Sequence, residues 1–145
     1  MRKKLLCAGL AALLLFALAA CGGGGSESES ESTLPDGFDE ESVTAAAKNV
    51  VSLANDGDYE TICGMLRDDL KDQLTPEALE EAWGGTLESF GAFQDYKTVA
   101  TASTQDTASG EDYAVVGLVC TYENGEGTFT LSFDKDLALV GLYLK

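Results

Sequence analysis

The chain contains no histidine and few basic residues. None of its 145 residues is His, and nine Lys and Arg stand against 25 Asp and Glu. Without histidine, the usual general base, the Ser-His and Cys-His nucleophile pairs and the commonest zinc ligand are all missing. The negative charge argues against nucleic-acid binding, which depends on cationic contacts to phosphates. We therefore expect no nucleic-acid partner, and no residue set in the chain forms a catalytic signature.

Metal and phosphate motifs are missing as well. Residues 55–60 (NDGDYE) contain the acidic and glycine residues of a calcium loop, but Cys63 stands where that loop needs a bidentate Glu. Residues 22–25 are all glycine, yet they neither follow a predicted strand nor open a predicted helix, as a phosphate-binding loop does. The sequence therefore predicts no metal site and no cofactor.

The N-terminus has the pattern of a bacterial lipoprotein signal. Residues 2–4 are basic, residues 5–17 are mostly apolar, and Leu18-Ala19-Ala20-Cys21 follows as a lipobox. The apolar run is shorter than the ~20 residues that span a bilayer, which disfavours a transmembrane helix. We expect cleavage after residue 20, acylation of Cys21, and a lipid-anchored location on the extracytoplasmic face of the cell membrane.

Three segments with different roles follow from this pattern. Residues 1–20 are the predicted signal peptide, residues 21–36 the lipidated cysteine and a disordered tether, and residues 37–145 one domain. The tether sequence GGGGSESESEST (residues 22–33) has nothing to bury and repels itself. The signal holds three basic and no acidic residues, so residues 21–145 carry six basic and 25 acidic residues, a net charge of −19. Anionic lipid repels so acidic a chain, and the acyl group must hold it at the bilayer.

Two cysteines remain in the domain. Cys63 and Cys120 form the one pair that an exported protein can oxidise once Cys7 leaves with the signal and Cys21 carries lipid. The alternative is two buried free thiols that behave as small apolar side chains. The sequence leaves both open, and it predicts contact between the segments that carry the two residues.

The periodicity of apolar residues predicts an α+β fold. Apolar residues recur at helical spacing after Asp39, after Asp58 and after the Thr75-Pro76 start signal, with Gly84-Gly85 interrupting the third segment. Strand patterns follow at residues 93–104, 112–122, 128–133 and 137–144, separated by turn sequences. About three helices followed by four strands predict helices packed on one face of an antiparallel meander.

Five aromatic residues are candidate lining of a pocket between helices and sheet. Aromatics at this spacing are also typical of a core, which is the structural alternative. The candidates are Trp83, Phe90, Tyr96, Tyr113 and Tyr122.

The order of residues resembles the domain of unknown function 3887 family, a family of small exported bacterial domains. The resemblance covers roughly residues 40–145 and includes a Gly-Asp-Tyr turn, a "Leu-Thr…Trp" helix, a "Gly-x-Phe" strand start and a closing strand; these lie at residues 57–59, 74–83, 91–93 and 133–142. It implies a cone-shaped, nuclear-transport-factor-2-like (cystatin-like) fold with a strongly curved sheet. It also implies a binding or accessory role, and it defines no catalytic residue.

These observations favour a non-catalytic, membrane-tethered domain that binds a small ligand, a peptide or an envelope protein. Two alternatives stay open. One is an enzyme that uses carboxylates and tyrosines in the same cone, which would need a carboxylate poised by burial. The other is a structural module that forms a homodimer through an exposed sheet face.

Overall fold

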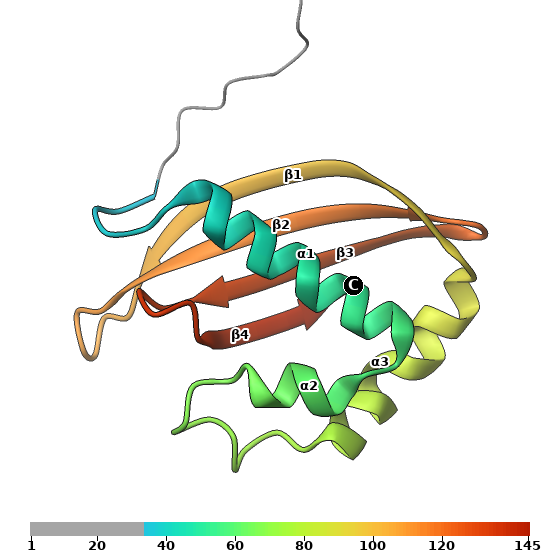
Figure 1. Cartoon of the computed structure of the whole chain (residues 1–145), viewed down its shortest axis with the longest axis horizontal. Coiled ribbons are helices and arrows are strands. Elements are labelled where there is room, and N and C mark those ends of the chain that lie inside the picture. Colours follow the sequence, from blue (N-terminus) through green and yellow to red (C-terminus); the bar gives the residue numbers. More distant parts are fainter. Residues whose placement is uncertain (1–33) are drawn as a thin grey trace, which may run out of the picture.

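The computed structural model describes residues 34–145, so the predicted signal peptide, Cys21 and residues 22–33 lie outside the described residues. Within residues 34–145 three helices precede four strands, which confirms the predicted α+β class (Figure 1). The elements are α1 (Glu40–Asp56), α2 (Tyr59–Gly64), α3 (Pro76–Phe90), β1 (Phe93–Gln105), β2 (Asp112–Tyr122), β3 (Gly125–Phe133) and β4 (Leu139–Leu144). No helix in this part of the chain has the length and hydropathy needed to cross a membrane.

The helix boundaries follow local capping chemistry. The Asp39 carboxylate accepts a hydrogen bond from the Ser42 amide at 2.8 Å, and the Thr75 hydroxyl accepts one from the Ala78 amide at 3.2 Å. Both satisfy amides of the first turn that have no partner within the helix. Gly57 ends α1 with φ +75°, a left-handed conformation that glycine adopts without strain. These three signals are readable in the sequence.

Helix α3 runs through Gly84-Gly85 without a break. Two glycines inside a helix cost about 1 kcal/mol each relative to alanine. Packing offsets this cost, because Leu79, Trp83 and Leu87 are all buried on the inner side of α3. Tertiary contacts, rather than local propensity, therefore decide that α3 is continuous.

The strands form one open antiparallel sheet in the order β1-β2-β3-β4, as the sequence predicted. Two irregularities near the start of β1 accompany its bend, and Figure 1 shows the long first strands curving over α1. Two strand starts differ from the prediction. β3 starts already at Gly125, because the β2–β3 turn is short, and Leu137 belongs to the turn before β4, where its φ is +61°.

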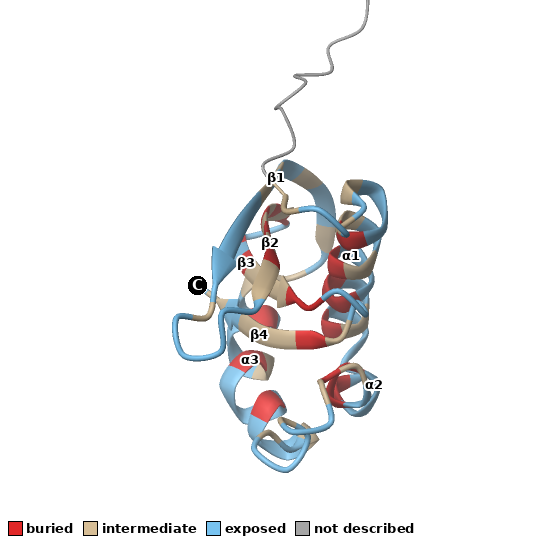
Figure 2. Ribbon diagram, turned by 90° about the vertical axis from the view of Figure 1, so that its left-hand side faces the viewer, coloured by how far each residue is buried: buried red, intermediate tan, exposed pale blue. Residues whose placement is uncertain are grey.

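The inner face of the sheet and the helices form one core. Alternate residues of β2 and β3 point inward, and Leu118, Phe129, Leu131 and Phe133 are completely buried. In Figure 2 the buried positions of α1 and of the central strands face one another. The domain's own side chains thus fill the centre of the curved sheet, and cavities lie toward its margins.

Candidate functional site

Three surface cavities surround α2 and α3 in the described part of the chain. Their volumes are about 400, 350 and 400 Å³. All three lie in the range of roughly 300–1,000 Å³ that is typical of ligand clefts. They differ in the chemistry of their walls.

The first cavity, here called the helix-end pocket, lies where α1 and α3 end and β1 begins. Its wall includes Asn55 and Asp56 of α1, Tyr59 of α2, and Glu88 of α3. It contains no lysine or arginine. A cavity of this composition attracts positive charge.

The second cavity, here called the α3–β4 groove, is mainly apolar. It lies between the segment that joins α2 to α3, the first half of α3, and β4. Its wall is formed by Leu66, Leu70, Gln73, Leu74, Leu79, Ala82, Trp83, Val140, Gly141 and Leu142. The groove offers aliphatic and indole surface with one amide side chain.

The free edge of β4 borders this groove. Leu139 donates its amide hydrogen to the Met65 carbonyl at 2.8 Å, and its carbonyl accepts one from the Arg67 amide at 3.0 Å. The Leu66–Leu139 bridge is parallel, so the α2–α3 segment starts a fifth strand and then leaves the edge. Beyond this point, the β4 edge is open toward the groove.

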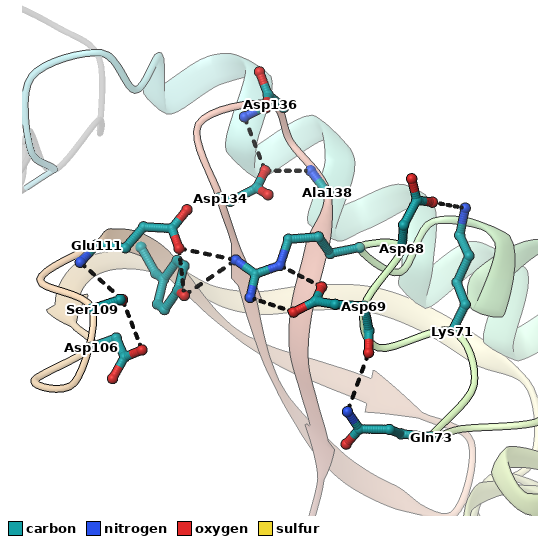
Figure 3. Close-up of polar contacts among 12 residues, drawn as sticks. Asp68, Asp69, Lys71, Gln73, Asp106, Ser109, Glu111, Asp134, Asp136 and Ala138 are labelled. Carbon is teal, nitrogen blue, oxygen red and sulfur yellow. Dashed lines mark hydrogen bonds and ion pairs between the residues drawn. The ribbon is translucent and has the colours of Figure 1, made fainter.

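Arg67 lies in the wall of the third cavity and is the centre of a charged network (Figure 3). The Arg67 guanidinium contacts Asp69 at 2.7 Å and Glu111 at 3.1 Å, and it donates a hydrogen bond to the Tyr113 hydroxyl at 3.3 Å. The hydrogen bond to Asp69 keeps the pKa of Arg67 above its usual range and that of Asp69 below it. Because these groups are largely solvent-exposed, the network contributes little stability; it joins the α2–α3 segment to the β1–β2 loop.

Asp134, at the edge of the third cavity, is a buried carboxylate with an evident structural role. One of its oxygens accepts hydrogen bonds from the Asp136 and Ala138 amides, both at 2.9 Å. The carboxylate therefore closes the β3–β4 turn, as Figure 3 shows. Among residues 34–145, no group of three or more Asp, Glu, Cys or His residues is arranged to hold a metal ion.

The five predicted lining residues are dispersed. Trp83 lies in the wall of the α3–β4 groove and meets Phe129 edge to face at 5.4 Å. Tyr113 lies at the Arg67 network. Tyr96 and Tyr122 each pack against the ring of Phe93, and Phe90 packs against Tyr122. These three candidates line none of the three cavities.

Two tyrosines of this cluster tie α1 to the sheet. The Tyr122 hydroxyl donates a hydrogen bond to the Asn55 side-chain oxygen at 2.8 Å. Burial raises the pKa of Tyr122, and the hydrogen bond to Asn55 opposes this shift only in part. The Tyr96 hydroxyl donates to the Lys48 carbonyl at 3.4 Å, and the Lys48 ammonium lies 5.1 Å from the Tyr96 ring. The bond to Asn55 holds the end of α1 that borders the helix-end pocket, and the contacts with Lys48 hold the middle of the helix.

Cys63 and Cys120 are free and buried in the structure. Cys120 lies on the inner face of β2, and burial raises its pKa to about 11. Burial also raises the pKa of Cys63. Both thiols are therefore protonated and unreactive at neutral pH.

The sequence did not single out Tyr59 or β4 as parts of a site. Tyr59 follows the apolar spacing of α2, so its pattern indicates a core position, and its ring is indeed buried. The residues of β4 are uniformly apolar, and the pattern does not reveal which edge of the strand stays open. The edge stays open because the α2–α3 segment leaves β4 after Arg67.

The fold and these cavities define a class, a small α+β domain in which α1 and α3 pack on an open antiparallel sheet and α2 packs on both of these helices. The chain belongs to the family described as "Protein of unknown function (DUF3887)", which matches residues 47–142. It is similar to the NMR structure of a protein from Ruminococcus gnavus ATCC 29149, with 28% identity and a TM-score of 0.69 over 77% of this chain and 96% of that one. No curated protein matches the chain.

Proposed function

We propose that the protein is a lipid-anchored binding domain on the extracytoplasmic face of the membrane, and that its α3–β4 groove holds an extended segment of another envelope protein. The observation that carries this proposal is the apolar groove lying directly beside the open edge of β4. The lipobox at Cys21 and the tether of residues 22–33 support the location.

The hydrogen-bonding pattern of β4 favours an extended partner. Thr128 and Lys145 exchange backbone hydrogen bonds at 2.9 and 3.0 Å. Because alternate residues of an antiparallel ladder direct their backbone groups to opposite edges, those of Leu144 and Leu142 point away from β3. Within residues 34–145, no other segment bonds to these groups. An added strand satisfies them and continues the ladder that Met65 and Arg67 begin.

The side chains of such a strand match the groove. Alternate residues of an added strand project to the same side. The side that faces α3 meets Leu70, Leu79 and Trp83, so we expect apolar residues there. The net charge of −19 over residues 21–145 favours a partner segment that is neutral or basic at its remaining positions.

Tryptophan fluorescence tests this proposal directly, because Trp83 is the single tryptophan of the chain. The probe is the alternating peptide acetyl-Lys-Val-Leu-Val-Leu-Lys-amide, added to the full-length protein in detergent. We expect a saturable change in Trp83 emission and shifts of the Leu142 and Leu144 amide resonances. The matched control is the same peptide with alternate amides N-methylated, which cannot donate to a strand edge.

Equal binding of both peptides excludes strand addition, and no saturable change with either contradicts the proposal. The location is tested separately. A palmitate analogue supplied to cells that produce the protein labels the wild type and leaves Cys21→Ser unlabelled. If the wild type is not labelled, the hypothesis of a lipid anchor at Cys21 is wrong. The hypothesis that the groove binds a peptide is then tested by the fluorescence measurement alone.

A homodimer is the second candidate, and the outer face of the sheet favours it. The row Ala100–Gly117–Thr130–Tyr143 crosses all four strands without a charged residue, and Tyr143 is 60% exposed. Two copies of so acidic a chain repel each other, and the repulsion is smallest if they associate through this uncharged face. Sedimentation of wild type and Tyr143→Glu distinguishes the cases: a dimer that the substitution dissociates supports this candidate, and a monomeric wild type removes it.

A further inference from the structure

The helix-end pocket is negative for reasons that go beyond its two carboxylates. It receives the C-terminal ends of both α1 and α3, which Figure 1 shows at the same end of the molecule. Each end carries the negative pole of its helix, and neither helix has a basic residue in its last turn. Asp56 and Glu88 add full negative charges at these ends. Nothing in the wall of the pocket compensates this charge.

A hydroxyl without a hydrogen-bond partner among residues 34–145 lies in the same wall. Tyr59 is only 8% exposed, and its hydroxyl makes no hydrogen bond within residues 34–145. Burial raises the pKa of Tyr59, so the hydroxyl is protonated at neutral pH and can accept a hydrogen bond from a ligand. Because the hydroxyl oxygen is accessible from the pocket, a ligand or water can bond to it there.

Because Gly84 has no side chain, the space beside the Tyr59 hydroxyl is open to the pocket. A Cβ atom placed on Gly84 would lie 3.7 Å from the Tyr59 hydroxyl oxygen. The position is in the middle of α3, where glycine is otherwise unfavourable. A larger side chain at position 84 would cover the Tyr59 hydroxyl and narrow the pocket. This explains why glycine stands at this position although it is unfavourable inside a helix.

The remaining wall is apolar and aromatic. Leu87, Ala92 and Phe93 complete the pocket beside the ring of Tyr59. A bare metal ion does not suit this wall, because hard cations require several oxygen ligands around them. An ammonium group on a hydrocarbon stem does suit it: the charge meets carboxylates, helix carbonyls and the phenol, while the stem meets aliphatic and aromatic surface.

We propose that the helix-end pocket binds a primary alkylammonium group, with Asp56, Glu88 and the Tyr59 hydroxyl as the groups that receive it. This site is separate from the α3–β4 groove and does not rest on it. The ammonium can belong to a free aliphatic amine or to a lysine side chain, which share the same chemistry. The experiment below has one arm for each source.

The test uses the full-length protein in detergent at low salt, with amide resonances of Asn55, Gly57, Gly84 and Gly91 as the readout. The probes are n-pentylamine for a free amine, Nα-acetyl-lysine-N-methylamide for a lysine side chain, and 1-pentanol as an uncharged isostere. We expect saturable shifts with at least one amine and none with pentanol. The amine that binds more tightly identifies the source.

Variants then assign the groups. We expect Asp56→Asn and Glu88→Gln each to weaken amine binding roughly two- to fivefold, the range for partly exposed charge pairs, and the double variant to weaken it further. Tyr59→Phe weakens binding without changing the net charge. Asp72→Asn is the matched control: it removes one exposed charge from the α2–α3 segment, outside the pocket wall.

Three outcomes overturn the proposal. They are the absence of a saturable shift with either amine, equal binding of pentanol, and equal loss of affinity in Asp72→Asn and in the pocket variants. Far-UV circular dichroism shows that each variant is folded, so that a loss of binding is not a loss of structure. The peptide measurement on the groove is independent, because Trp83 is not in the wall of the helix-end pocket.

Discussion

The two ends of helix α3 make two different kinds of wall. Near its start, Leu79 and Trp83 belong to the apolar α3–β4 groove, while near its end Leu87 and Glu88 belong to the helix-end pocket. The groove is built from side chains that also hold the core together, since Trp83 packs against Phe129. The pocket is built from helix termini and from polar atoms that have few partners.

This difference has a consequence for stability and binding. A wall that belongs to the core stabilises the fold whether or not a ligand is bound. Acidic side chains without a basic partner, such as those of the pocket wall, contribute little to the fold and gain a partner only when a ligand binds. Substitutions in the groove should therefore be costly, and substitutions of polar groups in the pocket should be neutral or stabilising.

The largest effect is expected for Trp83→Ala. Removal of a buried indole should lower the free energy of unfolding by about 3–5 kcal/mol, because a cavity forms against Phe129. Urea unfolding followed by circular dichroism measures it, since the variant has no tryptophan. Trp83→Phe should lose less. A loss below about 1 kcal/mol for the alanine variant would mean that the groove wall is not part of the core.

Gly91→Ala should destabilise by about 1–3 kcal/mol, the cost of holding a residue in a sparsely populated backbone region. Gly91 has φ +78° and ψ −151°, and a Cβ atom there would meet the Asn124 side-chain nitrogen at 2.9 Å. Gly85→Ala is the matched control, because nothing lies within 4 Å of its Cβ position; it should stabilise α3 by about 0.5–1 kcal/mol. Thermal unfolding of both variants gives the comparison, and equal effects would argue against strain at Gly91.

Two tyrosine substitutions compare a paired hydroxyl with an unpaired one. Tyr122→Phe should cost about 0.5–1.5 kcal/mol, because Asn55 loses its hydrogen bond. Tyr59→Phe should change the free energy of unfolding by less than about 0.5 kcal/mol, since its hydroxyl has no partner among the described residues. Denaturant unfolding measures both. A larger loss for Tyr59→Phe would show that the hydroxyl is already satisfied in the free protein.

Neutralising the acids of the pocket should raise stability slightly. Asp56→Asn and Glu88→Gln should each add about 0.3–1 kcal/mol at low ionic strength, because each removes a negative charge from a helix C-terminus. The gain should shrink in added salt, which screens exposed charges. Thermal unfolding at two salt concentrations tests this, and a salt-independent loss of stability would be the opposite of the expected result.

The pH dependence of stability isolates Cys120. Its pKa is raised from 9.0 to about 11 by burial, so the folded state holds the proton more tightly than the unfolded state. Its contribution is complete below pH 9 and is lost as the pH rises to about 11. Buried tyrosines shift in the same direction, so the measurement is the difference between wild type and Cys120→Ala. Parallel pH curves for the two proteins would show that the thiol does not titrate differently on folding.

Much of the fold could be predicted from local patterns. The caps at Asp39 and Thr75 and the bounds of β2 each depend on a few neighbouring residues, and these predictions are confirmed. The turn between β2 and β3 is shorter than predicted, because Gly125 already belongs to β3. The start of β4 was wrong by two residues, because Leu137 extends the apolar run yet lies in the turn that Asp134 closes. A run of apolar residues cannot distinguish a strand from a turn anchored by a side chain.

The site was harder to predict than the fold. Aromatic residues at core spacing were candidates for a pocket, and of the five only Trp83 lies in the wall of a described cavity. Tyr96 and Tyr122 instead bond to α1, which no periodicity reveals. Cavities form where neighbouring helices and strands do not pack closely, and this depends on the three-dimensional arrangement of the elements.

By itself, the sequence determined the class of the fold, the element order, the excess of negative charge and the expectation of a lipid anchor, because these depend on composition and short-range spacing. Only the tertiary structure decided that α1 and α3 end at one pocket and that, among residues 34–145, the edge of β4 stays open and the Tyr59 hydroxyl has no hydrogen-bond partner. These features arise between residues far apart in the chain, and their geometry exists only once the core is packed.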